Sequence, residues 1–205
     1  MIAQSLRRVG WRQWVWVVIG LALIVLMRKN MLSYDERLAP LPVHGALEQR
    51  VVGRTFAVTV KGFRLARSYK TAGGWVSRQQ TLVLKTPGIW MSTVVSLEAF
   101  QQPVGAVSAR VRAADGSYYT AGASDRPTVK GVNLTGEPVL PGLPQNGAYF
   151  FELPPAQLVG AHLEFFTAPH VPGSNDALVD IDLGLDKAKV DELVAKAPDE
   201  VSLLP

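Results

Sequence analysis

Three aspartates near the C-terminal end, Asp180, Asp182 and Asp186, have a spacing that could bind a hard cation. They flank Gly184 in the run Asp-x-Asp-x-Gly-x-Asp, and clustered carboxylate oxygens are the ligands that Ca²⁺ prefers. An EF-hand loop needs an acidic or amide residue just before its glycine, and Leu183 stands at that position. Alternation along a strand, followed by a helix cap at Asp186, explains the same residues. We therefore predict no metal site.

The remaining reactive side chains form no catalytic or ligand-binding pattern. Three histidines, His44, His162 and His170, share no helix-like spacing, whereas zinc needs three or four converging ligands. Cysteine is absent, which excludes a thiol nucleophile and cysteine metal sites. The serines lie in no G-x-S-x-G or S-x-x-K motif, and no glycine-rich phosphate motif opens a helix. We predict no catalytic residue and no cofactor; an enzyme with a site assembled from scattered residues is the alternative.

Charge is segregated along the chain. Residues 49–97 hold eight cations and no carboxylate, and residues 176–205 hold eight carboxylates and three lysines. One interpretation is a basic face that attracts anionic headgroups or cell-wall polymers. Its candidate residues are Arg54, Lys61, Arg64, Arg67, Lys70 and Arg78. We favour the other interpretation, in which the first and last strands are neighbours and their opposite charges pair, each pair contributing only about 0.2–1 kcal/mol.

Aromatic residues leave two questions open. Trp75 and Trp90 are either exposed rings on which a ligand stacks or buried parts of a core. Tyr149, Phe150 and Phe151 place rings on both faces of one strand, so a solvent-facing ring there would indicate a contact with a partner.

Alternating apolar and polar residues predict that short strands position these side chains. Fourteen prolines and eighteen glycines favour frequent turns, and no amphipathic helix separates the strands. The expected strands are 55–60, 63–67 after a turn near Gly62, 80–85, 90–100, 107–113, 118–121, 148–153, 163–167 and 177–183. A helix capped by Asp186 follows and ends at Pro198, with an apolar face that packs on the sheets. That face consists of Val190, Leu193, Val194 and Ala197. This order is typical of a β-sandwich or barrel.

Residues 14–27 run without a charge and favour a membrane anchor. The run is shorter than the ~20 residues that cross a bilayer core, but it can extend toward residue 9 if Arg12 reaches the headgroups. We expect the anchor at residues 13–32. Its apolar residues include Trp14, Val15, Trp16, Leu21, Leu23, Ile24 and Leu26. A cleaved signal peptide is the main alternative, although residues 27–32 lack a small-residue cleavage site; a buried helix is the other.

The chain then divides into five expected segments. They are a cytoplasmic leader at 1–12, the transmembrane anchor at 13–32, a tether at 33–48, the sandwich at 49–185, and a C-terminal helix and tail at 186–205. Basic residues flank the anchor almost equally, and the short leader with its free amino group favours a cytoplasmic N-terminus. The expected location is the cell membrane, single-pass, with the C-terminal domain extracytoplasmic.

Five short motifs carry a resemblance to a known family. They are Gly53-x-x-Phe56-x-Val58-x-Val60, Ala114-Asp115-Gly116-x-x-Tyr119, Pro141-Gly142-Leu143-Pro144, Phe151-Glu152-Leu153-Pro154 and Asp180-Ile181-Asp182-Leu183-Gly184-Leu185. Over residues 49–198 the chain resembles the actinobacterial family of secreted or membrane-anchored immunoglobulin-like domains of unknown function, related to the immunoprotective extracellular antigen fold. The resemblance implies a β-sandwich outside the membrane and no reaction. The chain departs from true immunoglobulins because it has no Cys…Trp…Cys core.

Together these observations predict an all-β, immunoglobulin-like β-sandwich with one N-terminal transmembrane helix and a short C-terminal helix. A net charge of +4 gives little support for nucleic-acid binding. The predicted function is a non-enzymatic binding or assembly module of the cell envelope, held at the membrane, whose partner is another envelope protein. No small-molecule substrate is evident. The alternative is binding of anionic cell-wall polymer or phospholipid headgroups through the basic first strands.

Overall fold

The computed structural model describes residues 11–30, 41–72, 81–122, 127, 129, 131–167 and 178–203. The chain divides into two compact units, Met1–Ala39 and Pro40–Pro205. The first unit contains the helix α1 (Trp11–Asn30), and the second contains the strands. The expected leader at residues 1–12 lies mostly outside the described residues.

α1 exposes apolar side chains on all sides. The four consecutive residues from Val15 to Val18 are all exposed, and consecutive residues of an α-helix point in different directions. The helix expected from the sequence is thus confirmed as a helix. The seven apolar residues named for the anchor, Trp14, Val15, Trp16, Leu21, Leu23, Ile24 and Leu26, are all exposed. Among the described residues, no helix is both long enough and apolar enough to cross a membrane.

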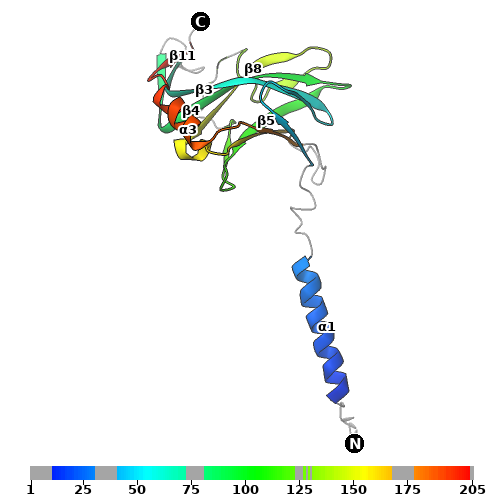
Figure 1. The fold of residues 1–205 in the computed structure, drawn as a ribbon. Coiled ribbons are helices and arrows are strands. Elements are labelled where there is room, and N and C mark those ends of the chain that lie inside the picture. The colour runs from blue at the N-terminus through cyan, green and yellow to red at the C-terminus, as the bar shows by residue number, and fades with distance from the viewer. Residues whose placement is uncertain are drawn as a thin grey trace, which may run out of the picture. The chain divides into compact units, whose positions relative to one another are not determined.

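The second unit is a two-layered β-sandwich, which confirms the expected architecture (Figure 1). One sheet, sheet A, has the order β1-β10-β9-β5-β6, with β7 paired to β5; the other, sheet B, has the order β11-β3-β4-β8, with β2 paired to β3. Sheet A consists of β1 (Pro42–Ala46), β5 (Val104–Arg112), β6 (Tyr118–Thr120), β7 (Pro138–Val139), β9 (His162–Thr167) and β10 (Leu178–Asp182). Sheet B consists of β2 (Arg50–Val52), β3 (Phe56–Ala72), β4 (Thr81–Ala99), β8 (Gln145–Leu153) and β11 (Val201–Ser202).

β3 and β4 are far longer than the sequence predicts, because each fuses two expected strands. Gly62 was expected in a turn but instead lies at a register shift within β3, so the chain continues in extended form. β4 passes through Pro87 and Gly88 in the same way. At Gly88 a Cβ atom would lie 2.6 Å from the carbonyl oxygen of Leu153, so the close approach of β8 requires a glycine there. The two strands form one long antiparallel hairpin at the centre of sheet B.

Both ends of the domain are strands that the sequence did not predict. β1 pairs in parallel with β10, so the expected tether at 33–48 is wrong for Pro42–Ala46, which belong to sheet A. β11 pairs in parallel with β3, and the expected tail therefore closes one edge of sheet B. Pairing with a neighbouring strand satisfies the backbone hydrogen-bonding groups of these short segments. Their length and composition alone do not reveal that they form strands.

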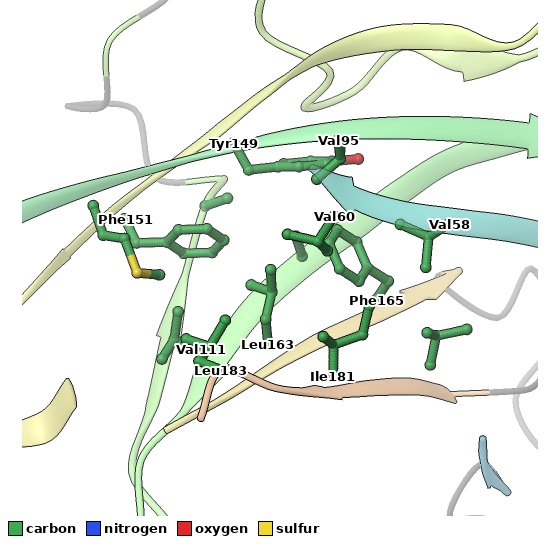
Figure 2. Packing of buried hydrophobic residues seen from close by; sticks show 14 of the residues in the cluster. Val58, Val60, Val95, Val111, Tyr149, Phe151, Leu163, Phe165, Ile181 and Leu183 are labelled. Atoms are coloured by element: carbon green, nitrogen blue, oxygen red, sulfur yellow. The ribbon is translucent and has the colours of Figure 1, made fainter. Parts of the chain in front are cut away.

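The core lies between the two sheets and follows the predicted alternation. Val107, Ala109 and Val111 of β5 face inward, as do four apolar residues of β4, Met91, Val95, Leu97 and Ala99. Figure 2 shows Val58, Val60, Val95, Tyr149 and Phe151 of sheet B meeting Val111, Leu163, Phe165, Ile181 and the adjacent Leu183 from the opposite layer. The Tyr149 hydroxyl donates a hydrogen bond of 2.7 Å to the Val107 carbonyl and thereby joins the sheets. Burial of this ring raises the pKa of Tyr149.

The C-terminal helix α3 (Lys187–Ala195) is confirmed with its cap. The Asp186 side chain accepts a hydrogen bond of 2.8 Å from the Lys189 amide, as expected for an N-cap. Val190 is buried against the core, and Leu193, Val194 and Ala197 pack on it. The short 3-10 helix η1 (Pro155–Leu158) lies beside α3.

Candidate binding groove

The outer face of sheet B carries a second apolar cluster that a solvent-facing sheet does not need. Tyr69, Trp90 and Phe150 pack edge to face, with ring centroids 6.1 Å apart for Tyr69–Trp90 and 5.4 Å apart for Tyr69–Phe150. Val201 and Leu203 of the C-terminal tail pack on these rings. Trp90 and Phe150 are therefore buried, and neither is an exposed stacking ring.

The tail covers this cluster only in part and leaves a groove of about 580 Å³. The apolar residues of its floor include Val94, which is 44% exposed, and its far wall includes Val132, which is 39% exposed. α3 and the tail form the other wall through Leu193, Ala197, Pro198, Val201 and Leu203. Ligand pockets of small molecules have volumes of about 300–1,000 Å³ and mostly apolar linings, and this groove matches both properties.

Two cations, Arg64 and Lys196, lie among the described lining residues, which include no carboxylate. Arg64 pairs across the strands with Ser92, and Ser92 pairs with Phe150, so a guanidinium, a hydroxyl and a ring follow one row of the sheet. Burial raises the pKa of Tyr69, while its hydrogen bond with Ser92 and the nearby charge of Arg64 act in the opposite direction. Lys196 is bound to Glu192 one helical turn away, which leaves Arg64 as the stronger site for an anion.

The basic residues named from the sequence differ in their partners and in their exposure. Lys61 donates a 2.7 Å hydrogen bond to the Asn146 side chain, and Arg67 forms an ion pair of 3.3 Å with Asp199. Arg54 is exposed in the loop before β3, and Lys70 is half-buried near the far end of β3. Arg78 lies outside the described residues. Of this set, Arg64 is the one that lines the groove.

The outer face of sheet A carries a row of charges that crosses four strands. His44, Asp180, Glu164 and Arg110 are direct neighbours in register on β1, β10, β9 and β5. Arg112 joins the two carboxylates, at 2.5 Å to Glu164 and 2.9 Å to Asp180. The hydrogen bond with Glu164, opposed by burial, raises the pKa of the Arg112 guanidinium. Arg110 contacts Glu164 at 2.7 Å and lies over the rings of Tyr118 and Phe166.

This charged row corrects the expected environment of Asp180 and the histidines. Asp180 faces outward as predicted but is only 3% exposed, because Arg112 and two imidazoles cover it. His162 and His44, expected to be scattered, both contact Asp180 at 2.8 and 3.2 Å. Two guanidinium groups pair with the two carboxylates of this row. Within the described part of the chain, no three His, Asp or Glu residues are grouped to bind a metal ion.

Sequence reasoning found Arg64 but missed the rest of the groove. Val94, Val132, Lys196 and Leu203 come from four separate segments, and only the fold brings them together. The run Tyr149, Phe150 and Phe151 carried a usable signal, because rings on both faces of a strand require a second apolar surface. That second surface is the cluster under the tail.

Comparison of the sequence with family models and with curated proteins finds no match. Solved structures give distant similarities. An uncharacterized β-sandwich protein from Clostridium difficile 630 has 9% identity, with 70% of this chain and 95% of that chain covered at a TM-score of 0.43. The secreted protein MPT63 from Mycobacterium tuberculosis has 14% identity, with 69% and 97% covered at 0.46. The yjhA protein from Bacillus subtilis has 13% identity, with 67% and 99% covered at 0.46.

At TM-scores below 0.5 these similarities assign neither a family nor a function, and the sandwich rests on the strand pairing described above. The finer resemblance to the actinobacterial immunoglobulin-like family stays a prediction.

Proposed function

We propose that the domain is a non-enzymatic binding module of the cell envelope, located outside the cytoplasm, that takes its ligand in the groove on sheet B. The observation that carries the proposal is the groove itself, an apolar hollow of about 580 Å³ with Arg64 and Lys196 in its lining. Assembly with another envelope protein, expected from the sequence, belongs to the same proposal.

The groove favours this proposal over a general basic surface. Two of the cations expected to bind headgroups or wall polymer are engaged within the protein, Lys61 with Asn146 and Arg67 with Asp199. The ion pair with Asp199 offsets part of the charge that Arg67 can offer to a polyanion, and salt screens exposed charges further. Arg64 instead combines its charge with an adjacent apolar surface, which gives a bound ligand two kinds of contact.

A lysine at position 94 tests the groove. The tagged full-length chain is purified from gently solubilised native membranes. We expect the amount of the co-purified component to fall by about tenfold or more in Val94→Lys. The reason is that an ammonium group in an apolar groove must be desolvated when a ligand binds. Val52→Lys is the matched control, because Val52 is 48% exposed on β2 and does not line the groove. If both variants retain the same components as the natural chain, the groove is not the binding site.

Attachment to the membrane through residues 13–32 is a further part of the proposal. It is supported by the exposed apolar side chains that surround α1, a helix of 20 residues. The charge-free run is shorter, so the anchor requires the basic residues at both helix ends to reach the headgroups.

We expect the chain to stay in the membrane pellet after alkaline carbonate extraction. Leu23→Arg combined with Ile24→Arg should release it, because each arginine near a helix centre opposes insertion by about 2.5–3.5 kcal/mol. Leu82→Arg, on an exposed residue of β4, should not release it. A natural chain found wholly in the carbonate supernatant would exclude the anchor.

A further inference from the structure

We propose that the groove binds a single-chain anionic amphiphile of the fatty-acid class, with its head group at Arg64 and its alkyl chain along Val94 and Phe150. This inference rests on the proposed function, since it names the ligand of the same groove. An anionic amphiphile fits this lining because the lining combines two cations with apolar surface.

The head-group end of the groove is built from three neighbouring strands. Arg64 on β3 is in register with Ser92 on β4, and Ser92 is in register with Phe150 on β8. Adjacent strands are about 4.8 Å apart, so the guanidinium and the Ser92 hydroxyl reach the same small anion. The Tyr69 hydroxyl, which is hydrogen-bonded with Ser92, adds a third polar group at this point. One of the two hydroxyls donates its proton to the other, so a carboxylate can accept hydrogen bonds from the guanidinium and from the remaining hydroxyl proton.

Apart from Lys196, the rest of the described lining is mostly apolar. Val94 and Ala148 are paired in the next row of the sheet, and Val132 lies against them from the loop before β7. Leu193 and Leu203 form the opposite wall. The volume lies in the lower half of the range for pockets that hold one small molecule, which favours one alkyl chain over two. An uncharged alkane would leave Arg64 unused, and a cationic amphiphile would face Arg64 and Lys196.

Photocrosslinking tests the ligand directly on the full-length chain in native membranes. The probe is palmitate that carries a diazirine in its alkyl chain, and crosslinked peptides are mapped by mass spectrometry. We expect crosslinks in the peptides that contain Val94, Phe150 or Leu203. Excess palmitate should remove them, and hexadecyltrimethylammonium should not. Arg64→Glu should reduce them by about tenfold, the loss expected for one charge-assisted hydrogen bond.

Arg54→Glu is the matched control, because Arg54 is exposed and lies outside the groove. It should leave the crosslinks unchanged, and Arg64→Lys should retain most of them because the charge is kept. Crosslinks that are insensitive to Arg64→Glu, or equally removed by the cationic amphiphile, would overturn the anionic specificity. Absence of groove crosslinks, together with a co-purified protein that Val94→Lys removes, would refute the amphiphile and leave the binding module standing.

Discussion

Replacing Arg112 by methionine should destabilise the domain by about 3–5 kcal/mol, the usual cost of stranding a buried charge. Arg112 is the one described side chain that contacts both Glu164 and Asp180, which are 2% and 3% exposed. Methionine keeps only the apolar stem of the side chain and leaves Asp180 with only imidazoles beside it. The measurement is the free energy of unfolding from a urea titration followed by tryptophan fluorescence.

Arg50→Met is the matched control for this prediction. Arg50 also pairs with a carboxylate, Glu98, at 2.7 Å, but both side chains are exposed, so its loss should cost about 1 kcal/mol or less. Adding Asp180→Asn to Arg112→Met should restore part of the lost stability, because the stranded charge is then removed. Equal costs for Arg112→Met and Arg50→Met would show that the charged row is in effect solvated.

Phe165→Ala should also cost about 3–5 kcal/mol, because it removes a large, fully buried side chain from the centre of the core. Phe165 packs edge to face with Tyr149, with ring centroids 5.8 Å apart, and so contacts the opposite sheet (Figure 2). The cavity left behind cannot collapse easily between two sheets held by hydrogen-bonded ladders. The same urea titration measures the effect.

The neighbouring residue provides the control for Phe165. Phe166 lies on the other face of β9, where it is partly exposed under Arg110. Phe166→Ala should cost about 1 kcal/mol, because an exposed ring with one cation–π contact contributes little. If the two substitutions had the same cost, the assignment of inner and outer faces along β9 would be wrong.

The alternation of apolar and polar residues along each strand made the core predictable from the sequence. The pairing of one strand with another was not predictable in this way. Val107, Ala109 and Val111 face inward as expected, because a period of two is a property of the local chain. The continuation of β3 through Gly62 depends on its partner β4, and glycine is compatible with either a turn or a bulge. β1 and β11 are strands of five and two residues, whose pairing depends on partners more than 100 residues away.

The candidate site shows the same limit. Arg64 was named for its charge, but charge alone also selected Arg67 and Lys61, which other side chains engage. Arg67 and Asp199 form an ion pair between the basic stretch and the acidic stretch, but the strands expected first and last, 55–60 and 177–183, lie in different sheets. Asp180, by contrast, binds Arg112 of β5, outside the basic stretch. The segregation of charge along the sequence therefore did not identify the main ion pairs. The order of the strands in each sheet decides which charged side chains lie next to one another.

β1 also determines how the domain responds to a mechanical load on its N-terminal side. Its five residues pair in parallel with β10, from Pro42 with Leu178 to Ala46 with Asp182. A pull on residue 41 acts along the strand, across the direction of the interstrand hydrogen bonds, so all five pairs are loaded together in shear. The contact between His44 and Asp180 lies in the middle of this ladder. A chain pulled at this end therefore resists extension through one short strand, and the force needed to detach it depends on five residues and one imidazole–carboxylate contact.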